Sequence, residues 1–273
     1  MTDIDKAARL RALHHGPPIL VLPNVWDAAT ARIVEAEGFP AIATTSAGVA
    51  AALGYADGGA VPAREMIEAV ARIARAVSVP VTADIEHGYA TTPDAVADVV
   101  LRVVAAGAVG VNLEDCLPES TDLESIDVQC DKIKAVARAA ATAGVGVVVN
   151  ARTDAFLRGI GPAEGRLDAS IARGRAYLAA GADCVFVPGV TDRETIAALV
   201  QGIGGPINIL AVAGSLPIPE LESIGVARVS LGSGPSRAAL SLMRDIAREL
   251  KAAGTYSFTS RALPYSDVNE LMR

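Results

Sequence analysis

Two pairs of acidic residues follow short apolar segments of the chain. Asp84 and Glu86 follow the apolar run 79–81, and Glu114 and Asp115 follow the apolar run 109–111. Short apolar runs bounded by turn residues are typical of buried parallel strands. Because α/β folds place their chemistry at the carboxyl ends of such strands, the acids should meet at one edge. Oxygen ligands without His or Cys partners favour Mg²⁺ or Mn²⁺, so we predict a divalent metal site in an enzyme that acts on a small anion.

Further polar residues follow other predicted strands. Arg152 is the one cation that the strand count places at this mouth, and a guanidinium there could clamp a substrate carboxylate. The alternative for Arg152 is an ion pair with Asp154 or a neighbouring acid. Ser46 and the Gly48 amide could donate to a second carboxylate or an oxyanion, or could bond only to their own loop. The remaining candidates are Ala47, Asp57, Asn112, Asn150 and Asn208.

Three other features have weaker functional readings. His87 follows the first acid pair and could act as an acid or base, but a surface histidine is the more ordinary interpretation. A reactive thiolate at Cys116 would need a nearby cation, and its neighbours in the sequence are acidic, which favours a structural cysteine. The segment 231–237 could hold phosphate at a helix N-terminus, although Pro235 suits an ordinary strand-to-helix turn equally well.

The order of elements predicts a (β/α)₈ barrel. Strand-like segments recur at 19–22, 41–44, 81–83, 109–113, 145–150, 183–187, 207–210 and 226–231. Helical patterns separate them, for example at 63–77, 93–106, 126–143, 164–180, 192–201 and 235–253. A doubly wound open sheet is the competing fold, but it would want a glycine-rich phosphate turn where the chain has residues 23–27. We expect one barrel domain over 1–254 and an extension over 255–273. A short helix at 267–272 would dock on the barrel or on a neighbouring subunit, and the alternative is a frayed terminus.

Composition narrows the function further. The net charge of −7 argues against a nucleic-acid surface. Three cysteines without a CxxC spacing indicate reduced thiols, and the acidic first residues do not resemble a signal peptide. The uncharged stretch 195–219 is interrupted by glycines and prolines, so it is not expected to span a membrane. These observations predict a soluble cytoplasmic protein.

The same residues form a set of motifs that resembles the isocitrate lyase/phosphoenolpyruvate mutase superfamily over nearly the whole chain. No single motif is specific, but the set is. The motifs are Asn24-Val25-Trp26-Asp27-Ala28, Thr44-Thr45-Ser46-Ala47-Gly48, Leu53-Gly54-Tyr55-Ala56-Asp57, Ala83-Asp84-Ile85-Glu86-His87-Gly88-Tyr89, Gly110-Val111-Asn112-Leu113-Glu114-Asp115 and Asn150-Ala151-Arg152-Thr153-Asp154.

The resemblance implies a Mg²⁺-dependent barrel enzyme, often tetrameric, whose last helix is commonly exchanged between subunits. Asp84 would match the direct metal ligand. The acids that hold metal-bound waters would be Asp57, Glu86 and Glu114. Groups that bind the 2-oxo acid would be Ser46, Gly48 and Arg152, with Trp26 lining the pocket. We take Arg152, Glu114 and Asp57 as the candidate catalytic residues, and count Ala47, Asp84 and Asn208 with the substrate-binding set.

Departures from the family pattern limit the reaction. The chain lacks the Lys-Arg/Lys-Cys-Gly-His lid of the isocitrate-cleaving members and both lid lysines of the phosphonate-processing members, and it has Glu86 where aspartate is usual. We therefore expect a divergent branch: a lyase that acts at a C–C bond of a small 2-oxo or 2-hydroxy acid, assembled as a dimer or tetramer. The alternatives are a phosphonopyruvate mutase or hydrolase, a non-catalytic 2-oxo acid binding protein, and an unrelated barrel whose mouth acids are coincidental.

Overall fold

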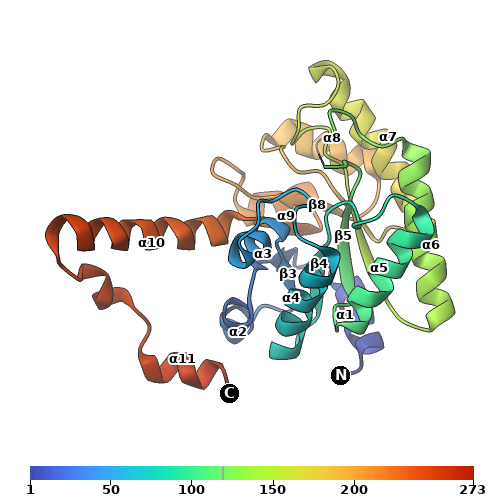
Figure 1. Cartoon of the computed structure of the whole chain (residues 1–273). Helices are drawn as coiled ribbons and strands as arrows, with labels where there is room; N and C mark the ends of the chain where they lie inside the picture. The colour runs from blue at the N-terminus through green and yellow to red at the C-terminus, as the bar shows by residue number, and fades with distance from the viewer. Residues whose placement is uncertain (119) are drawn as a thin grey trace.

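The computed structural model describes residues 1–118 and 120–273, and its strands form one parallel sheet that closes into a barrel (Figure 1). Strands alternate with helices along the chain, which confirms the predicted (β/α)₈ barrel. The strands are β1 (Leu20–Leu22), β2 (Asn24–Val25), β3 (Ile42–Thr44), β4 (Val81–Asp84), β5 (Gly110–Glu114), β6 (Val148–Arg152), β7 (Cys184–Phe186), β8 (Ile207–Leu210) and β9 (Arg228–Ser230).

The barrel closes through a first strand that is interrupted at Pro23. Before the proline, β1 pairs with β9, and after it, β2 pairs with β3. Proline has no backbone N–H to give to the ladder, so the strand changes partner there. The first strand was predicted at 19–22, before the proline, and the structure adds Asn24–Val25 after it. If the paired residues are followed from Leu20 through each neighbouring strand around the barrel, the register returns to the first strand at the level of Ala28. This shift is the stagger of eight residues that such a barrel requires.

Asn24 holds the interrupted strand in place. Its side-chain amide donates to the Thr44 carbonyl at 2.8 Å, on the β3 side of the break. Its carbonyl oxygen accepts from the backbone amides of Leu231 at 2.7 Å and Gly232 at 2.9 Å, just after β9. One buried side chain therefore ties together the two strands on either side of the closure.

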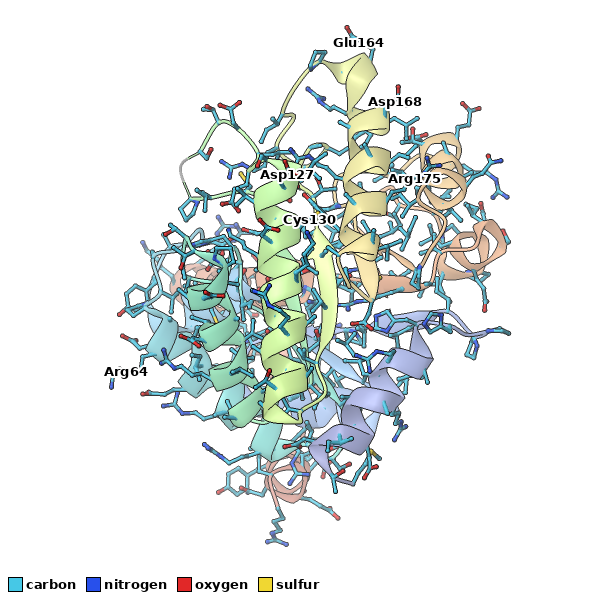
Figure 2. All side chains as sticks on the ribbon, turned by 90° about the vertical axis from the view of Figure 1, so that its right-hand side faces the viewer. Arg64, Asp127, Cys130, Glu164, Asp168 and Arg175 are labelled. Atoms are coloured by element: carbon cyan, nitrogen blue, oxygen red, sulfur yellow. The ribbon has the colours of Figure 1, made fainter. Side chains whose placement is uncertain are left out.

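An outer layer of helices covers most of the barrel. Figure 2 shows α6, which carries Asp127 and Cys130, beside α7, which carries Asp168 and Arg175. Ala7 and Leu10 of α1 pack with Leu20 and Leu22 and close one end of the barrel. The helices before the eighth βα unit are α1 (Asp3–Leu13), α2 (Ala28–Ala36), α3 (Ser46–Leu53), α4 (Ala63–Ala76), α5 (Pro93–Ala105), α6 (Ile126–Ala143), η1 (Ala163–Gly165), α7 (Arg166–Ala179), α8 (Arg193–Ile203) and α9 (Ile218–Ile224).

The helix that follows the last strand leaves the barrel. In Figure 1, α10 (Gly234–Ala253) extends away from the sheet as a straight arm. Ser236, in its first turn, is its one buried residue among those described. The chain continues through η2 (Ser257–Arg261) to α11 (Tyr265–Leu271), which lies against α2. The short terminal helix was predicted at 267–272 and begins two residues earlier in the structure.

In the described part of the chain, no helix is both long enough and apolar enough to cross a membrane.

Candidate active site

A cavity of about 300 Å³ opens at the carboxyl ends of the strands. Its lining includes six of the predicted site residues: Ser46, Ala47, Asp57, Asp84, Asn112 and Arg152. They come from the α3 N-terminus, the α3–α4 loop, β4, β5 and β6, so the fold brings together residues that are far apart in sequence. A cavity of this size is at the small end of ligand-binding sites, which fits a small organic acid.

Asp84, the last residue of β4, is held by three groups. Its backbone N–H donates to the Thr44 hydroxyl at 2.8 Å, and its two carboxylate oxygens accept from the Ser46 amide at 3.0 Å and the Asn112 side chain at 2.9 Å. Asn150 donates in turn to the Asn112 side-chain oxygen at 3.0 Å. The carboxylate therefore has a fixed orientation, and each oxygen keeps a second lone pair for another ligand.

Glu86 is buried below the mouth in a strained loop. Its backbone has φ = 52°, in the left-handed region that few residues other than glycine adopt, and Tyr89 has φ = 55°. The Tyr89 hydroxyl donates to Glu86 Oε1 at 3.0 Å. Burial, with the nearby charges of Asp84 and Asp57, raises the pKa of Glu86 to about 7, although the tyrosine hydrogen bond opposes this. Glu86 is not among the residues that line the cavity.

Asp57 lies at the rim, where the residue as a whole is exposed but its carboxyl is partly buried; this partial burial, with the charge of Asp84, raises its pKa as well. Negative charge is thus concentrated around Asp84, and a cation bound there would reduce the repulsion between the carboxylates.

Arg152 is paired with two acids. Its Nη1 lies 2.7 Å from Glu114 Oε2, while Nε and Nη2 donate to the two oxygens of Asp154 at 2.6 and 3.0 Å. The ion pair considered as the alternative role is therefore present, and the guanidinium also lines the cavity. Burial lowers its pKa, but Glu114 and Asp154 outweigh this and raise it overall, so Arg152 stays charged. For Glu114, burial raises the pKa and Arg152 opposes the shift.

Asp115 is a buried acid that holds the loop carrying Asp154. Its side chain accepts from the Asp154 backbone amide at 3.0 Å, from Arg173 at 3.0 Å and from the Tyr177 hydroxyl at 2.7 Å. Burial raises the pKa of Asp115, while Tyr177 and Arg173 lower it. Asp115 is fully buried, so it positions the loop that carries Asp154 and does not face the cavity.

Ser46, Ala47 and Gly48 form the first turn of a helix, where we had expected a loop. Thr45 caps α3 and accepts from the Gly48 amide at 3.4 Å, so this amide is engaged within its own helix. A Cβ on Gly48 would lie 3.0 Å from the Trp26 side chain, which explains the need for glycine there. Trp26 and Gly48 pack behind the cavity and do not line it. The helix N-terminus at Ser46 and Ala47 does reach the cavity.

Asn208 lies in the barrel interior. It is fully buried and donates to the Ser230 hydroxyl at 3.1 Å, and it is not among the lining residues. The interior is unusually polar for this fold, where Val, Ile and Leu normally dominate. Its buried polar side chains are Thr82, Asn112, Asn150, Asn208, Arg228 and Ser230.

The structure adds a cation beside Cys116. Arg158 Nη1 lies 2.8 Å from the thiol sulfur, a contact that the acidic neighbours in the sequence did not indicate. Burial nevertheless raises the pKa of the Cys116 thiol, with Arg158 opposing. His87 is partly buried with its ring 5.8 Å from that of Tyr89, and burial lowers its pKa. Neither residue lines the cavity.

The donor set fits Mg²⁺. No group of three or more His, Cys, Asp or Glu side chains is arranged around a metal position in residues 1–118 and 120–273. A closed protein cage of the zinc type is thus not formed there. Mg²⁺ usually takes one or two carboxylates and completes its shell with waters and substrate oxygens. The oriented Asp84 carboxylate, with Asp57 in the same open cavity, meets that requirement.

Other residues also line the cavity. Ser233 and Arg237, from the segment 231–237 that was considered for phosphate, line the wall next to α10. Phe186, which was not predicted, places its ring 5.9 Å from the Arg152 guanidinium. Arg228, at the start of β9, lines the cavity from inside the barrel. A single charged residue within an apolar strand segment was the available signal for Arg228.

Comparison with known proteins agrees with this architecture. The model of the family described as phosphoenolpyruvate phosphomutase matches residues 10–251. Protein Rv1998c of Mycobacterium tuberculosis (strain ATCC 25618 / H37Rv) is 38% identical over 94% of this chain and 93% of its own. The oxaloacetate decarboxylase of Bradyrhizobium sp. (strain ORS 278) is 31% identical over 92% of this chain and 90% of its own. The chain therefore belongs to the isocitrate lyase/phosphoenolpyruvate mutase superfamily of lyases and mutases, and is an enzyme of that superfamily.

Solved structures extend the comparison. A crystal structure from Burkholderia cenocepacia J2315 superimposes with a TM-score of 0.91 at 37% identity, covering 98% of this chain and 95% of that chain. A phosphonopyruvate hydrolase in complex with oxalate and Mg²⁺ gives 0.85 at 27% identity, over 97% and 94%. An oxaloacetate acetylhydrolase with the inhibitor 3,3-difluorooxaloacetate gives 0.88 at 25% identity, over 100% and 94%.

Proposed function

We propose that the enzyme is a Mg²⁺-dependent lyase that breaks the C3–C4 bond of a 2-oxo acid, with oxaloacetate decarboxylation as the model reaction. The observation that carries this proposal is the convergence of Asp84, Asp57, Arg152 and Ser46 on one small cavity. One relative over nearly the whole chain is an oxaloacetate decarboxylase, and a structural neighbour binds oxalate with Mg²⁺. The missing lid lysines favour this reaction over phosphonate chemistry.

The residues divide the work as follows. Asp84 and Asp57 would hold Mg²⁺, which, when bound, supplies Lewis-acid polarisation of the substrate's keto group. Arg152, fixed by Glu114 and Asp154, would donate to the carboxylate next to that keto group and set its orientation. The first turn of α3 at Ser46 and Ala47 would add hydrogen-bond donors and the positive end of the helix dipole.

In the reaction itself, the C3–C4 bond breaks and CO₂ leaves. The electron pair remains on C3 as the enolate of pyruvate, which then takes one proton to give pyruvate. Donors that are already in place when charge moves onto the keto oxygen stabilise this step, because they need no reorganisation.

The direct test is consumption of oxaloacetate with release of pyruvate, followed with and without Mg²⁺. Turnover should disappear with a chelator and return with Mg²⁺ or Mn²⁺. We expect Asp84→Ala to lower kcat/KM at least about 1,000-fold, because it removes an oriented ligand. Asp98→Ala, an exposed acid on α5, is the matched control. Unchanged turnover in Asp84→Ala would show that the assignment is wrong.

We further propose that the enzyme is a homo-oligomer in which α10 packs on a second copy. Most of α10 is unpacked in the single chain, and it exposes Leu240, Leu242, Met243 and Leu250. An apolar helix surface of this kind is normally covered in solution. Either a dimer or a tetramer would cover this surface of α10.

A further inference from the structure

Arg228 is a cation buried inside the barrel without a counter-ion. It is the first residue of β9 and is 3% exposed, yet its Nε and Nη1 have no hydrogen-bond partner among residues 1–118 and 120–273. No acid of that described part lies within ion-pair distance of it. Burial lowers its pKa to about 10, which leaves it charged at neutral pH. An unpaired buried guanidinium is costly, so it should have a use.

Cys184 and Asp84 oppose the effect of burial on the pKa of Arg228, but burial outweighs them and neither forms an ion pair with it in the described residues. Across the sheet it is paired in register with Asn208 on β8 and Leu20 on β1. Asn208 is already bonded to Ser230. In the same polar interior, Thr82 Oγ1 and Asn150 Oδ1 also have no hydrogen-bond partner among the described residues. Native proteins satisfy nearly all of their buried polar groups. We therefore expect these unpartnered atoms to bind a ligand that enters from the cavity.

The positions of the charged residues around the cavity indicate what kind of ligand would fit. The acids that line the cavity, Asp57 and Asp84, lie on the side of α3 and β4. Arg152 on β6 is already paired with two acids, and Arg237 lines the wall next to α10. Arg228 lies on β9, separated from β6 by two further strands in the sheet. A ligand with two separated anionic groups would satisfy both positions, with one group near Asp84 and Arg152 and the other near Arg228.

We propose that Arg228 binds the second carboxylate of a dicarboxylic 2-oxo acid, the carboxylate remote from Asp84. This inference rests on the proposed function and narrows its substrates to dicarboxylates. Arg228 is then a specificity-determining residue: acids with a single carboxylate fill the metal end of the cavity and leave its charge uncompensated.

Two probes separate this contact from a long-range effect of charge. Oxalate lacks a remote carboxylate, whereas 3,3-difluorooxaloacetate carries one. In calorimetric titrations with Mg²⁺ present, Arg228→Met should lose about 100-fold in affinity for the difluoro compound and less than about 3-fold for oxalate. An equal loss for both probes, or no loss for either, overturns the proposal.

Stability in the absence of ligand supplies the second readout. Replacing an unpaired buried cation by an apolar side chain of similar length should leave the denaturation midpoint unchanged or raise it. A large fall in the midpoint of Arg228→Met would show that the arginine is structural and would overturn the proposal. Arg193→Met, at an exposed pair with Glu220 on the outside of the barrel, controls for loss of a positive charge.

The outcomes also distinguish this inference from the function on which it rests. If the wild type binds neither probe with Mg²⁺, the proposed function fails first. If the wild type and Arg228→Met bind the difluoro compound equally, only the role of Arg228 fails. Phosphonopyruvate is the third probe, and tighter binding of it than of the difluoro compound would overturn the assignment of the remote group as a carboxylate.

Discussion

Arg152 donates through Nε and Nη2 to both oxygens of Asp154, two residues further along the same strand end. The same guanidinium also reaches Glu114 on the neighbouring strand. A side chain that is held from two directions cannot swing, and one N–H on each Nη nitrogen is left for a substrate. Glu114 and Asp154 therefore orient the Arg152 guanidinium and still leave it able to bind a substrate.

Asp154→Asn tests this aiming role. The amide keeps the shape of Asp154 but cannot accept from both donors, so Arg152 should lose its fixed orientation. We expect kcat/KM for oxaloacetate to fall about 10- to 100-fold, with most of the change in KM, because binding of substrate is what Arg152 supports. Steady-state kinetics with Mg²⁺ measures both constants. A fall in kcat alone would point to a role for Asp154 in the chemical step.

His14 should make the fold sensitive to mild acid. It is buried, its Nδ1 lies 2.8 Å from the Leu10 carbonyl, and burial with the charge of Arg228 lowers its pKa to about 3. The unfolded chain takes up a proton on this residue near pH 6.5, whereas the folded chain does so only near pH 3. Between these values the unfolded state binds more protons, so stability falls as the pH falls.

The expected contribution of His14 is a loss of about 2 kcal/mol between pH 6.5 and pH 5. Urea unfolding as a function of pH measures it. His14→Asn keeps a donor toward the Leu10 carbonyl without the titration, so its stability should change less over this range. His15→Asn, at the exposed neighbouring position, should follow the wild type. Parallel curves for all three proteins would contradict the prediction.

Lys132 and Glu124 form an ion pair in which the lysine side chain is fully buried. Removing one partner leaves the other charge buried without compensation, so Glu124→Gln should cost about 3 to 5 kcal/mol in the free energy of unfolding. Replacing both together, as Glu124→Leu with Lys132→Met, should recover much of this. Urea denaturation gives the values, and Glu68→Gln at an exposed pair should change stability by less than about 1 kcal/mol.

The surface of α10 predicts how the protein assembles. Leu240 is 58% exposed and Met243 is 59% exposed in the single chain. If a second copy covers them, Leu240→Glu and Met243→Glu should shift the particle toward the monomer, which light scattering after size exclusion measures. Arg244→Glu, an exposed polar position of the same helix, should leave the mass unchanged. A wild type that is already monomeric would contradict the proposed assembly.

Much of the fold follows from local patterns. The alternation of short apolar segments with helical ones predicts the barrel, since each type of segment has its own period in sequence. Asp84, Asp57, Ser46 and Arg152 could be assigned to one mouth because residues after parallel strands meet at one edge of the sheet. Pro23 was harder to interpret, because a proline at a strand break and a proline in a turn look alike in sequence.

What could not be predicted depends on contacts between distant segments. The contact between Arg158 and Cys116 requires knowing how two loops meet. The departure of α10 from the barrel could not be predicted from the sequence either. An amphipathic pattern shows that a helix packs against a partner, but it does not show whether that partner is the same chain or another one. The missing counter-ion of Arg228 becomes visible only when every neighbour in the barrel interior is placed.

The position of Asn24 links the reaction to the mechanical integrity of the fold. This side chain lines the cavity and also fastens the split first strand to its neighbours. A ligand that contacts Asn24 would therefore also restrain the interrupted first strand. Occupancy of the cavity should therefore also slow amide exchange in β1, although no residue of β1 lines the cavity.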